Sequence, residues 1–207
     1  MTESWHLVLP VALALVGVLF LAEFLMFRSK RRERERQDQD WERTLASIRE
    51  TLNSHERQQI TDDVVLRNES RKAMLDQVCK ATADSLHSAA AVITIVEHAG
   101  QRWLAYYGAD WCSGETQLGL LQPLETSYCQ YVVATERPLL VSDALKDLRL
   151  VNNDDETKRQ IRAYLGVPVY SHEGAVVGSL CVFHNEPRRW SKKDLTTVQS
   201  YAQAIVL

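Results

Sequence analysis

The sequence predicts an α+β domain in which helices at both ends pack on one face of an antiparallel sheet, preceded by a transmembrane helix and a coiled-coil-like helix. Three observations predict this arrangement. An apolar run opens the chain, the stretch from 28 to 89 lacks both Gly and Pro, and β-branched runs then lead to a closing amphipathic helix. A chain of 207 residues has room for one ordinary domain with such an appendage.

A transmembrane helix is expected at residues 7–27. These 21 residues are apolar except for Glu23, and a helix of about 20 such residues spans a bilayer. A cleaved signal peptide is not expected, because no Lys or Arg precedes the apolar run. The alternative is a buried helix of a soluble domain.

The basic segment at 28–40 orients this helix in the membrane. Six Lys or Arg residues lie within positions 28–36, and basic residues next to a span are retained on the cytoplasmic side. We therefore expect residues 1–6 outside and everything after residue 27 inside, at the cell inner membrane or plasma membrane. The basic segment would then lie against inner-leaflet lipid.

A helical linker is expected at 41–66. Because no Gly or Pro occurs from 28 to 89, no residue in this stretch breaks a helix. Apolar residues recur at the spacings of a coiled coil at Trp41, Leu45, Ile48 and Leu52. A parallel homodimer is favoured here over a solvated single helix.

The first half of a domain at 67–207 follows from changes in periodicity. Helical spacing places one face on Leu75, Val78, Cys79, Thr82 and Leu86. The next elements are expected in this order: strands at 91–96 and 102–107, a loose region at 108–125, a short helix at 127–135, a strand at 138–141, and a loose charged region at 142–162.

Two apolar strands and a helix complete the domain. The strands are expected at 164–171 and 176–184, with a hairpin turn at 172–174 between them. Pro168 cannot donate a ladder hydrogen bond, which indicates an edge or a bulge in the first strand. Ser191 and Asp194 predict a helix start, and the buried face of that helix is Leu195, Val198, Ala202 and Ile205.

Composition excludes several classes of protein. A net charge of −3 and a pI of about 6.1 give no basis for nucleic-acid binding. The cysteines lie at positions 79, 112, 129 and 181, which is neither a metal cluster nor a disulfide framework. In the cytoplasm these thiols would be reduced at rest.

Several segments together resemble a bacterial GAF domain over about residues 67–205. They are 127–131 (SYCQY), 138–143 (PLLVSD), 164–169 (YLGVPV), 178–182 (GSLCV) and 187–191 (PRRWS). The resemblance implies a six-stranded antiparallel sheet with helices on one side and a pocket for a small molecule on the other. It also implies a sensory or regulatory role, often in a dimer joined through the first and last helices.

The ligand signatures of GAF relatives do not identify a cofactor. The run 152–156 lacks the order of the cyclic-nucleotide motif of phosphodiesterases, and Gln130 stands where bilin-binding relatives carry His after the cysteine. For haem, His184 at the end of a buried strand is more simply a satisfied polar residue. The cofactor remains unknown, and no metal site is expected.

Candidate ligand-binding residues come from positions within the GAF-like segments. They are Tyr128, Cys129, Tyr131, Asp143, Tyr164 and Cys181. Each of these side chains could equally serve core or edge packing. The region 142–162 could close over a pocket as a lid, and its Arg159 and Arg162 could meet an anionic ligand or simply face water.

Cys129 is the candidate reactive thiol. It falls in the first turn of a short predicted helix, where backbone dipoles stabilise a thiolate. Cys181 lies in an apolar strand and is interpreted as a small buried hydrophobe. Some GAF proteins reduce free methionine sulfoxide with cysteines over the pocket, but Cys112 and Cys129 do not fit that pattern clearly.

The sequence therefore favours a membrane-anchored cytoplasmic sensor over an enzyme. It would bind a small ligand or sense redox state, and occupancy would shift the population between two arrangements of a helical homodimer. No effector segment is expected after the closing helix, which reaches Leu207, so the output partner would act in trans unless an effector has been lost. The alternatives are a thiol enzyme of the free methionine sulfoxide reductase type and a non-sensing membrane scaffold.

Overall fold

The computed structural model describes residues 23–29, 31–32, 36, 39, 43, 46–47, 50, 59–61, 64, 71–108, 118–150 and 153–207. The chain divides into two compact units at residues 44 and 45, and each is described by itself.

The first unit contains a described helical stretch at 23–29. Four successive apolar side chains there, from Phe24 to Phe27, are exposed, and the Arg28 guanidinium lies 5.5 Å from the centre of the Phe24 ring. The rest of the predicted span 7–27 lies outside the described residues. Within the part of the chain that the structure describes, no helix combines the length and the apolar character needed to cross a membrane.

The predicted coiled coil also falls largely outside the described residues, including all four seam positions at 41, 45, 48 and 52. In the second unit, the described residues Ile60 and Val64 pack against the hydrophobic core of the domain. Residues ahead of position 67 therefore contribute to that core.

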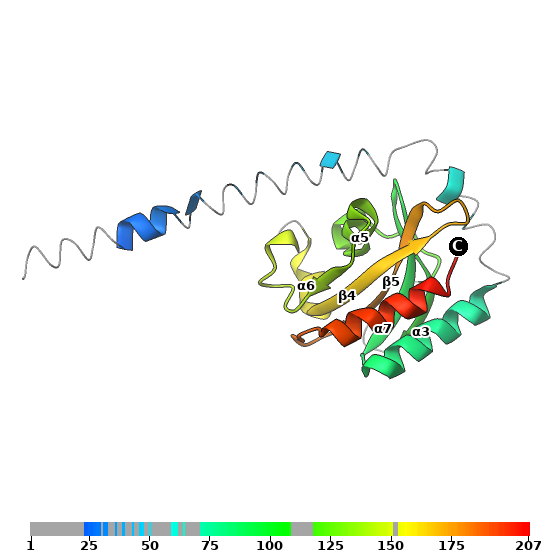
Figure 1. Cartoon of the computed structure of the whole chain (residues 1–207). Helices are drawn as coiled ribbons and strands as arrows, with labels where there is room; N and C mark the ends of the chain where they lie inside the picture. The colour runs from blue at the N-terminus through cyan, green and yellow to red at the C-terminus, as the bar shows by residue number, and fades with distance from the viewer. Residues whose placement is uncertain are drawn as a thin grey trace, which may run out of the picture. The chain divides into compact units, whose positions relative to one another are not determined.

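The second unit contains an antiparallel sheet with the strand order β2-β1-β5-β4-β3 (Figure 1). Its strands are β1 (Ala90–Glu97), β2 (Gly100–Gly108), β3 (Leu139–Val141), β4 (Ala163–Tyr170) and β5 (Val176–His184). Its helices are α3 (Lys72–Leu86), α5 (Cys129–Thr135), α6 (Asp155–Gln160) and α7 (Lys192–Gln203). The α+β antiparallel fold is confirmed. The resemblance implied six strands, whereas the described residues form a sheet of five.

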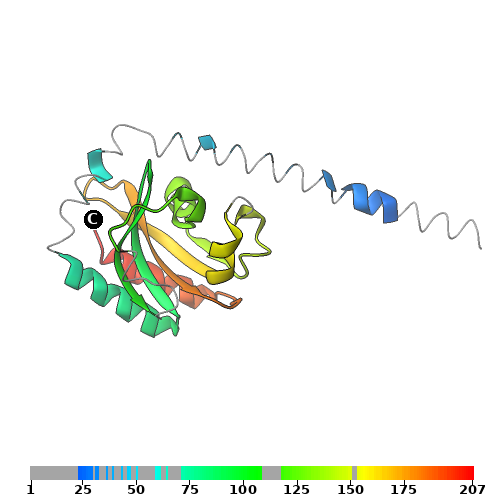
Figure 2. The same cartoon turned by 180° about the vertical axis from the view of Figure 1, so that it is seen from behind.

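Helices α3 and α7 lie side by side on one face of the sheet (Figures 1 and 2). They cover an aliphatic core that includes Leu75 and Cys79 from α3, Val198 from α7, and Ile93 and Leu180 from the sheet. The helical face predicted at 75–86 is the buried face of α3. The terminal helices thus share one face, as expected.

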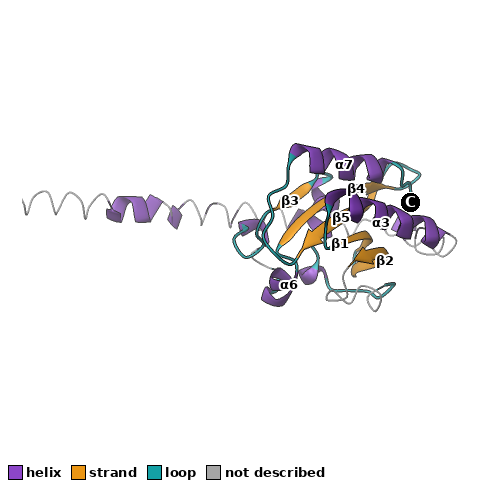
Figure 3. Ribbon diagram, turned by 90° about the horizontal axis from the view of Figure 1, so that it is seen from below, coloured by secondary structure: helices purple, strands orange, loops and turns teal. Residues whose placement is uncertain are grey.

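The opposite face of the sheet is not free of helices. Figure 3 shows α6 across the sheet from α3 and α7, and α5 contacts β1, β4 and β5. The expectation that helices pack on one face holds for the terminal pair only. The short helices α5 and α6 belong to the segments that connect β2 to β3 and β3 to β4, and these segments cross the other face.

The β4–β5 hairpin forms where two apolar runs flank a turn. β5 has the predicted bounds, and Gly174 in the turn adopts a φ of 83°, which suits glycine. Pro168 pairs with Ser179 of β5, but β3 pairs only with residues 164–166 of β4. Pro168 therefore lies in an edge portion of β4, where its missing N–H costs no ladder bond.

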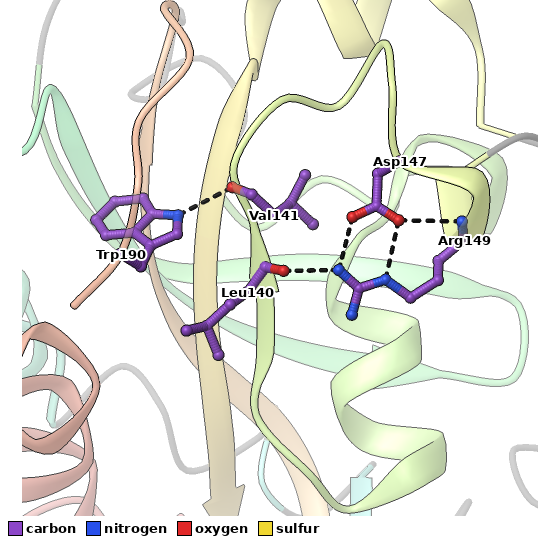
Figure 4. A network of polar contacts seen from close by, with 5 residues as sticks. All are labelled: Leu140, Val141, Asp147, Arg149 and Trp190. Atoms are coloured by element: carbon purple, nitrogen blue, oxygen red, sulfur yellow. Dashed lines mark hydrogen bonds and ion pairs between the residues drawn. The ribbon is translucent and has the colours of Figure 1, made fainter. Parts of the chain in front are cut away.

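The short edge strand β3 is held by side chains from outside the sheet (Figure 4). Arg149 donates from Nη2 to the carbonyl of Leu140 at 2.6 Å and pairs with Asp147 at 2.6 Å. The indole of Trp190 donates to the carbonyl of Val141 at 2.9 Å. These bonds satisfy edge carbonyls and blunt the edge of the sheet.

The predicted capping box starts α7, because the Ser191 hydroxyl accepts from the backbone of Asp194 and the Asp194 carboxylate accepts from the backbone of Ser191. The end of the helix was predicted wrongly. α7 ends at Gln203, and the backbone N–H of Leu207 donates to Tyr170 of β4 at 2.8 Å. Ile205 is buried, but it lies beyond the helix and reaches the core from this extended tail.

Candidate functional site

Strand alternation separates an aliphatic face from a more polar one. In β1 and β5, residues such as Ile93 and Leu180 point to the core under α3 and α7. Their neighbours Thr94, Ser179 and Cys181 line up on the other face, because the register pairs Thr94 with Ser179 and places Cys181 two residues along. The polar groups therefore meet beneath α5.

Tyr164 of β4 reaches into this group because its neighbour Gly166 has no side chain. A Cβ at position 166 would lie 2.1 Å from the Tyr164 hydroxyl, so the hydroxyl occupies the space that glycine leaves. From there Tyr164 Oη lies 3.3 Å from Cys129 Sγ and 3.4 Å from Ser179 Oγ. Tyr128 packs edge-on against the Tyr164 ring.

The thiols of Cys129 and Cys181 face each other across this space, with their Sγ atoms 4.0 Å apart. Cys129 is the first residue of α5, and Cys181 is in the middle of β5. Both are buried free thiols. The predicted thiol of α5 and the supposed structural thiol of the sheet thus form one pair.

The pair ionises as a unit, because the two thiols share hydrogen bonds. The hydrogen bond between Cys129 and Cys181, supported by contacts with Thr94, Tyr164 and Ser179, outweighs burial and lowers the pKa of Cys129. The bond to Cys129 and then burial raise the pKa of Cys181. Burial raises the pKa of Tyr164 as well, so its hydroxyl stays neutral and can donate.

A small cavity of about 20 Å³ adjoins the two thiols. It is lined by Val92, Thr94, Gln101, Trp103, Thr126, Tyr128, Cys129, Ile161, Tyr164, Cys181 and Phe183. Among these described side chains none carries a formal charge. Only Thr126 and Ile161 are half-buried and the others are buried, so solvent approaches from the side of these two residues.

Three hydrogen bonds fasten the segment 153–161 over this cavity. The Tyr128 hydroxyl donates to the Ile161 carbonyl at 3.2 Å, and the Tyr131 hydroxyl donates to Asn153 Oδ1 at 2.7 Å. The amide of Asn153 donates in turn to the carbonyl of Ser127 at 3.3 Å. The region predicted as a lid therefore lies closed against the start of α5.

Four of the six predicted ligand-binding residues come together at the cavity: Tyr128, Cys129, Tyr164 and Cys181. Tyr131 and Asp143 do not line it. Tyr131 belongs to the fastening just described, and Asp143 binds Arg162 at 2.7 Å and Lys146 at 3.1 Å. Arg162 is therefore committed to a carboxylate.

Two further residues named in the sequence analysis, Arg159 and Cys112, are not among the described residues that line the cavity. Arg159 is exposed, which agrees with a side chain that faces water. Cys112 lies outside the described residues.

Sequence reasoning missed Thr94, Ser179 and Gly166. Thr94 and Ser179 are polar residues inside apolar strands, and each shares the strand parity of a pocket residue, Val92 and Cys181 respectively. That parity was a usable signal. The role of Gly166 depends on the tilt of one tyrosine ring, which no pattern of residue types encodes.

His184, the residue weighed as a haem ligand, lies against Arg188 in the structure. Its Nε2 lies 2.6 Å from Nη1 of Arg188, and burial followed by the Arg188 charge lowers the pKa of the imidazole. Among the described residues, no three His, Cys, Asp or Glu side chains cluster closely enough to hold a metal ion.

Comparison with known proteins places the chain in a family. A family model described as GAF domain matches residues 70–207, and the chain belongs to the GAF family. Over 154 residues the chain is 28% identical to a cyclic di-GMP phosphodiesterase of Pseudomonas aeruginosa. That match covers 73% of this chain and 25% of the enzyme, so the chain spans about a quarter of that relative's length.

Two solved structures share the fold. The GAF domain of an Acinetobacter phosphoenolpyruvate-protein phosphotransferase gives a TM-score of 0.51 at 18% identity, over 73% of this chain and 90% of that one. A type II free methionine-R-sulfoxide reductase from Thermoplasma acidophilum gives 0.51 at 14% identity, over 65% and 89%. The family and its relative support a sensory or regulatory role.

Proposed function

From its membership of the GAF family, we propose that the chain is a membrane-anchored cytoplasmic sensor of redox state whose sensing element is the thiol pair Cys129 and Cys181. The carrying observation is the distance of 4.0 Å between their Sγ atoms. A disulfide has an S–S length of about 2.05 Å, so a small approach of α5 and β5 would close it. Hydrogen bonds outweigh burial and lower the pKa of Cys129, which favours its reaction as a thiolate.

Segment 153–161, the lid, would change the protein surface when the disulfide forms. Disulfide formation would draw the start of α5 toward β5 by up to about 2 Å. Tyr128 and Tyr131 hold the segment 153–161 from that same turn of chain. Movement of the turn would loosen these bonds, so the oxidised and reduced proteins would present different lid surfaces.

The anchor and the dimer rest on sequence and on local structure. The apolar run 7–27, the basic segment that follows it and the exposed apolar side chains from Phe24 to Phe27 support a single span with inner-leaflet lipid around it. The residues are expected to place the N-terminus outside. The heptad spacing from Trp41 to Leu52 supports a parallel homodimer that passes the signal to a partner in trans.

The relative from Pseudomonas supports a regulatory role, because the matched stretch makes up 25% of a longer enzyme. For this chain, we propose that the output partner is a separate protein.

Reduction of free methionine sulfoxide is the enzyme alternative, and the described site does not favour it. A free amino acid carries an ammonium and a carboxylate, whereas the described cavity lining offers no charged partner for either group. Turnover of free methionine sulfoxide in the presence of a dithiol reductant would restore this alternative. If the two thiols never react, the remaining alternative is a membrane scaffold that does not sense a signal.

The test equilibrates the full chain, purified in detergent, in mixtures of reduced and oxidised dithiothreitol. Free thiols are then blocked with a maleimide, and peptides are mapped by mass spectrometry. We expect a Cys129–Cys181 disulfide at the oxidising end that disappears in Cys129→Ser and persists in Cys79→Ser. Free thiols at both positions under all conditions would contradict the proposal.

Cell fractionation tests the anchor separately. The intact chain should be recovered in the membrane fraction, and a reporter fused after Leu207 should remain inside the cell. Recovery in the soluble fraction, or a reporter outside the cell, would remove the anchor from the account while leaving the thiol pair to be judged by its own test.

A further inference from the structure

The cavity beside the thiols limits the size of what can reach them. Its volume is about 20 Å³, while pockets for drug-sized ligands measure about 300–1,000 Å³. A single buried water needs at least about 10–15 Å³. A molecule of about two heavy atoms is therefore the largest that enters without opening the lid.

The residues that line the cavity also limit the charge of a molecule that can enter it. Apart from the Cys129 thiol, the described side chains around the cavity are apolar or neutral, and an anion taken from water into such a place pays a desolvation penalty without a partner. Hydroxyl groups are present at Thr94 and Tyr164. A neutral molecule that both donates and accepts hydrogen bonds fits these groups.

The mouth of the cavity adds a steric filter. Ile161 and Thr126 are the half-buried members of the lining, and the Ile161 backbone is held by Tyr128 at 3.2 Å. The branched side chain of Ile161 thus lies where solvent approaches. A bulky reagent can reach the thiols only when the hydrogen bonds that hold segment 153–161 break, whereas a small reagent can enter while they are intact.

We propose that the oxidant this site admits is hydrogen peroxide, and that Cys129 is the thiol it oxidises first. This inference rests on the proposed redox function and specifies its substrate. Hydrogen peroxide is neutral, has two heavy atoms and both donates and accepts hydrogen bonds. Of the two thiols, Cys129 is the one whose Sγ lies 3.3 Å from the Tyr164 hydroxyl, within hydrogen-bond distance.

Hydrogen peroxide would oxidise the thiol pair to a disulfide in two steps. Sulfur of Cys129 attacks one peroxide oxygen, the O–O bond breaks, and the proton given up by Cys129 ends on the departing hydroxide as water, leaving a sulfenic acid. The thiol of Cys181 then attacks that sulfur, the S–O bond breaks, and a second water leaves. Two thiols are oxidised to one disulfide, and one hydrogen peroxide is reduced to two waters.

Trapping experiments test which thiol reacts first. In Cys181→Ser the second step is blocked, so dimedone should label Cys129 after brief exposure to hydrogen peroxide. In Cys129→Ser, dimedone should not label Cys181. Labelling of Cys181 without Cys129 would overturn the order of the two thiols.

Competing oxidants test the size filter. The reduced full chain is mixed with hydrogen peroxide or tert-butyl hydroperoxide, and the rate of disulfide formation is compared with the rate for the same chain unfolded in urea. Folding should raise the ratio of the two rates in favour of hydrogen peroxide by at least about tenfold. Ile161→Ala should return this ratio toward the unfolded value by speeding the bulkier peroxide.

The outcomes separate the two proposals. A disulfide that forms in the dithiothreitol equilibrium but shows no preference for hydrogen peroxide would overturn this inference and leave the redox function standing. Absence of the disulfide under both conditions would overturn both.

Discussion

Both faces of the sheet bury cysteine, and the thiols Cys79 and Cys129 have contrasting surroundings. Under α3 and α7, Cys79 lies in an aliphatic core, where burial and then the charge of Asp76 raise the pKa of its thiol. Under α5, Cys129 is also buried, but it lies within reach of Cys181 and Tyr164. Burial is common to both thiols, so hydrogen-bond partners decide which one ionises.

The largest expected effect is a loss of stability that differs between two adjacent residues of β5 whose side chains point to opposite faces of the sheet. Leu180 is fully buried in the aliphatic core, so Leu180→Ala should lower the free energy of unfolding by about 3 kcal/mol. Ser179 points to the thiol face, and Ser179→Ala should lower it by less than about 1 kcal/mol. Urea unfolding of both variants measures the difference. Equal losses would show that the two faces contribute alike.

Gly166→Ala should disturb the thiol face alone. The new Cβ would lie 2.1 Å from the Tyr164 hydroxyl, which must move away from Cys129. We expect a loss of about 1–3 kcal/mol in stability and slower reaction of Cys129 with methyl methanethiosulfonate.

The matched control for this variant is Tyr164→Phe/Gly166→Ala, which removes the atom nearest to the added methyl group. Because the two positions are in contact, their effects should not add, and the double variant should recover part of the lost stability. Simple additivity would mean that the hydroxyl does not occupy the space beside Gly166.

Tyr164→Phe alone should change the chemistry of the site more than its stability. The variant loses the bonds at 3.3 Å to Cys129 and 3.4 Å to Ser179, worth about 1 kcal/mol. Without this donor the pKa of Cys129 should rise toward its ordinary value, and so should the midpoint pH of its reaction with methyl methanethiosulfonate. Cys79 serves as an internal control and should stay unreactive in the folded protein. An unchanged midpoint would remove Tyr164 from the account.

The smallest effect concerns the helix that covers the aliphatic face. Burial alone would raise the pKa of Asp194, but bonds from the backbone N–H and hydroxyl of Ser191 outweigh it and hold the pKa below 3.8. Asp194→Ala should therefore cost about 0.5 kcal/mol at neutral pH and leave Cys129 as reactive as before. Since the folded pKa is depressed, this contribution is present above the unfolded pKa and is lost as the pH falls through the folded one. A constant difference across acid unfolding curves would contradict this.

The sequence predicted the elements that depend on local pattern. The closing hairpin follows from apolar runs around Gly174, the start of α7 from Ser191 and Asp194, and the face of α3 from helical spacing. The end of α7 was missed, because the spacing continues to Ile205 although the chain has already left the helix. There a sheet-edge bond from Leu207 to Tyr170 at 2.8 Å prevails over helical propensity.

The candidate site could be predicted only in part. The resemblance selected Cys129 and Tyr164, which line one cavity in the structure, but it could not show that Cys181 faces Cys129. That contact depends on the register of β5 against β4, in which Cys181 pairs with Gly166. Tyr131 and Asp143 belong to segments of the same motifs, yet each bonds to a partner in the lid region instead. Motif membership fixes the backbone position of a residue and leaves the direction of its side chain open.

The most direct test of the account uses a chain in which Cys129 and Cys181 are the remaining cysteines, made by Cys79→Ser and Cys112→Ser. Its intact mass is measured before and after brief treatment with hydrogen peroxide, and again after reduction. We expect the mass of a single polypeptide, without a disulfide between chains, that falls by two hydrogen atoms on oxidation and regains them on reduction. An unchanged mass, stable addition of oxygen, or a disulfide that joins two chains would contradict it.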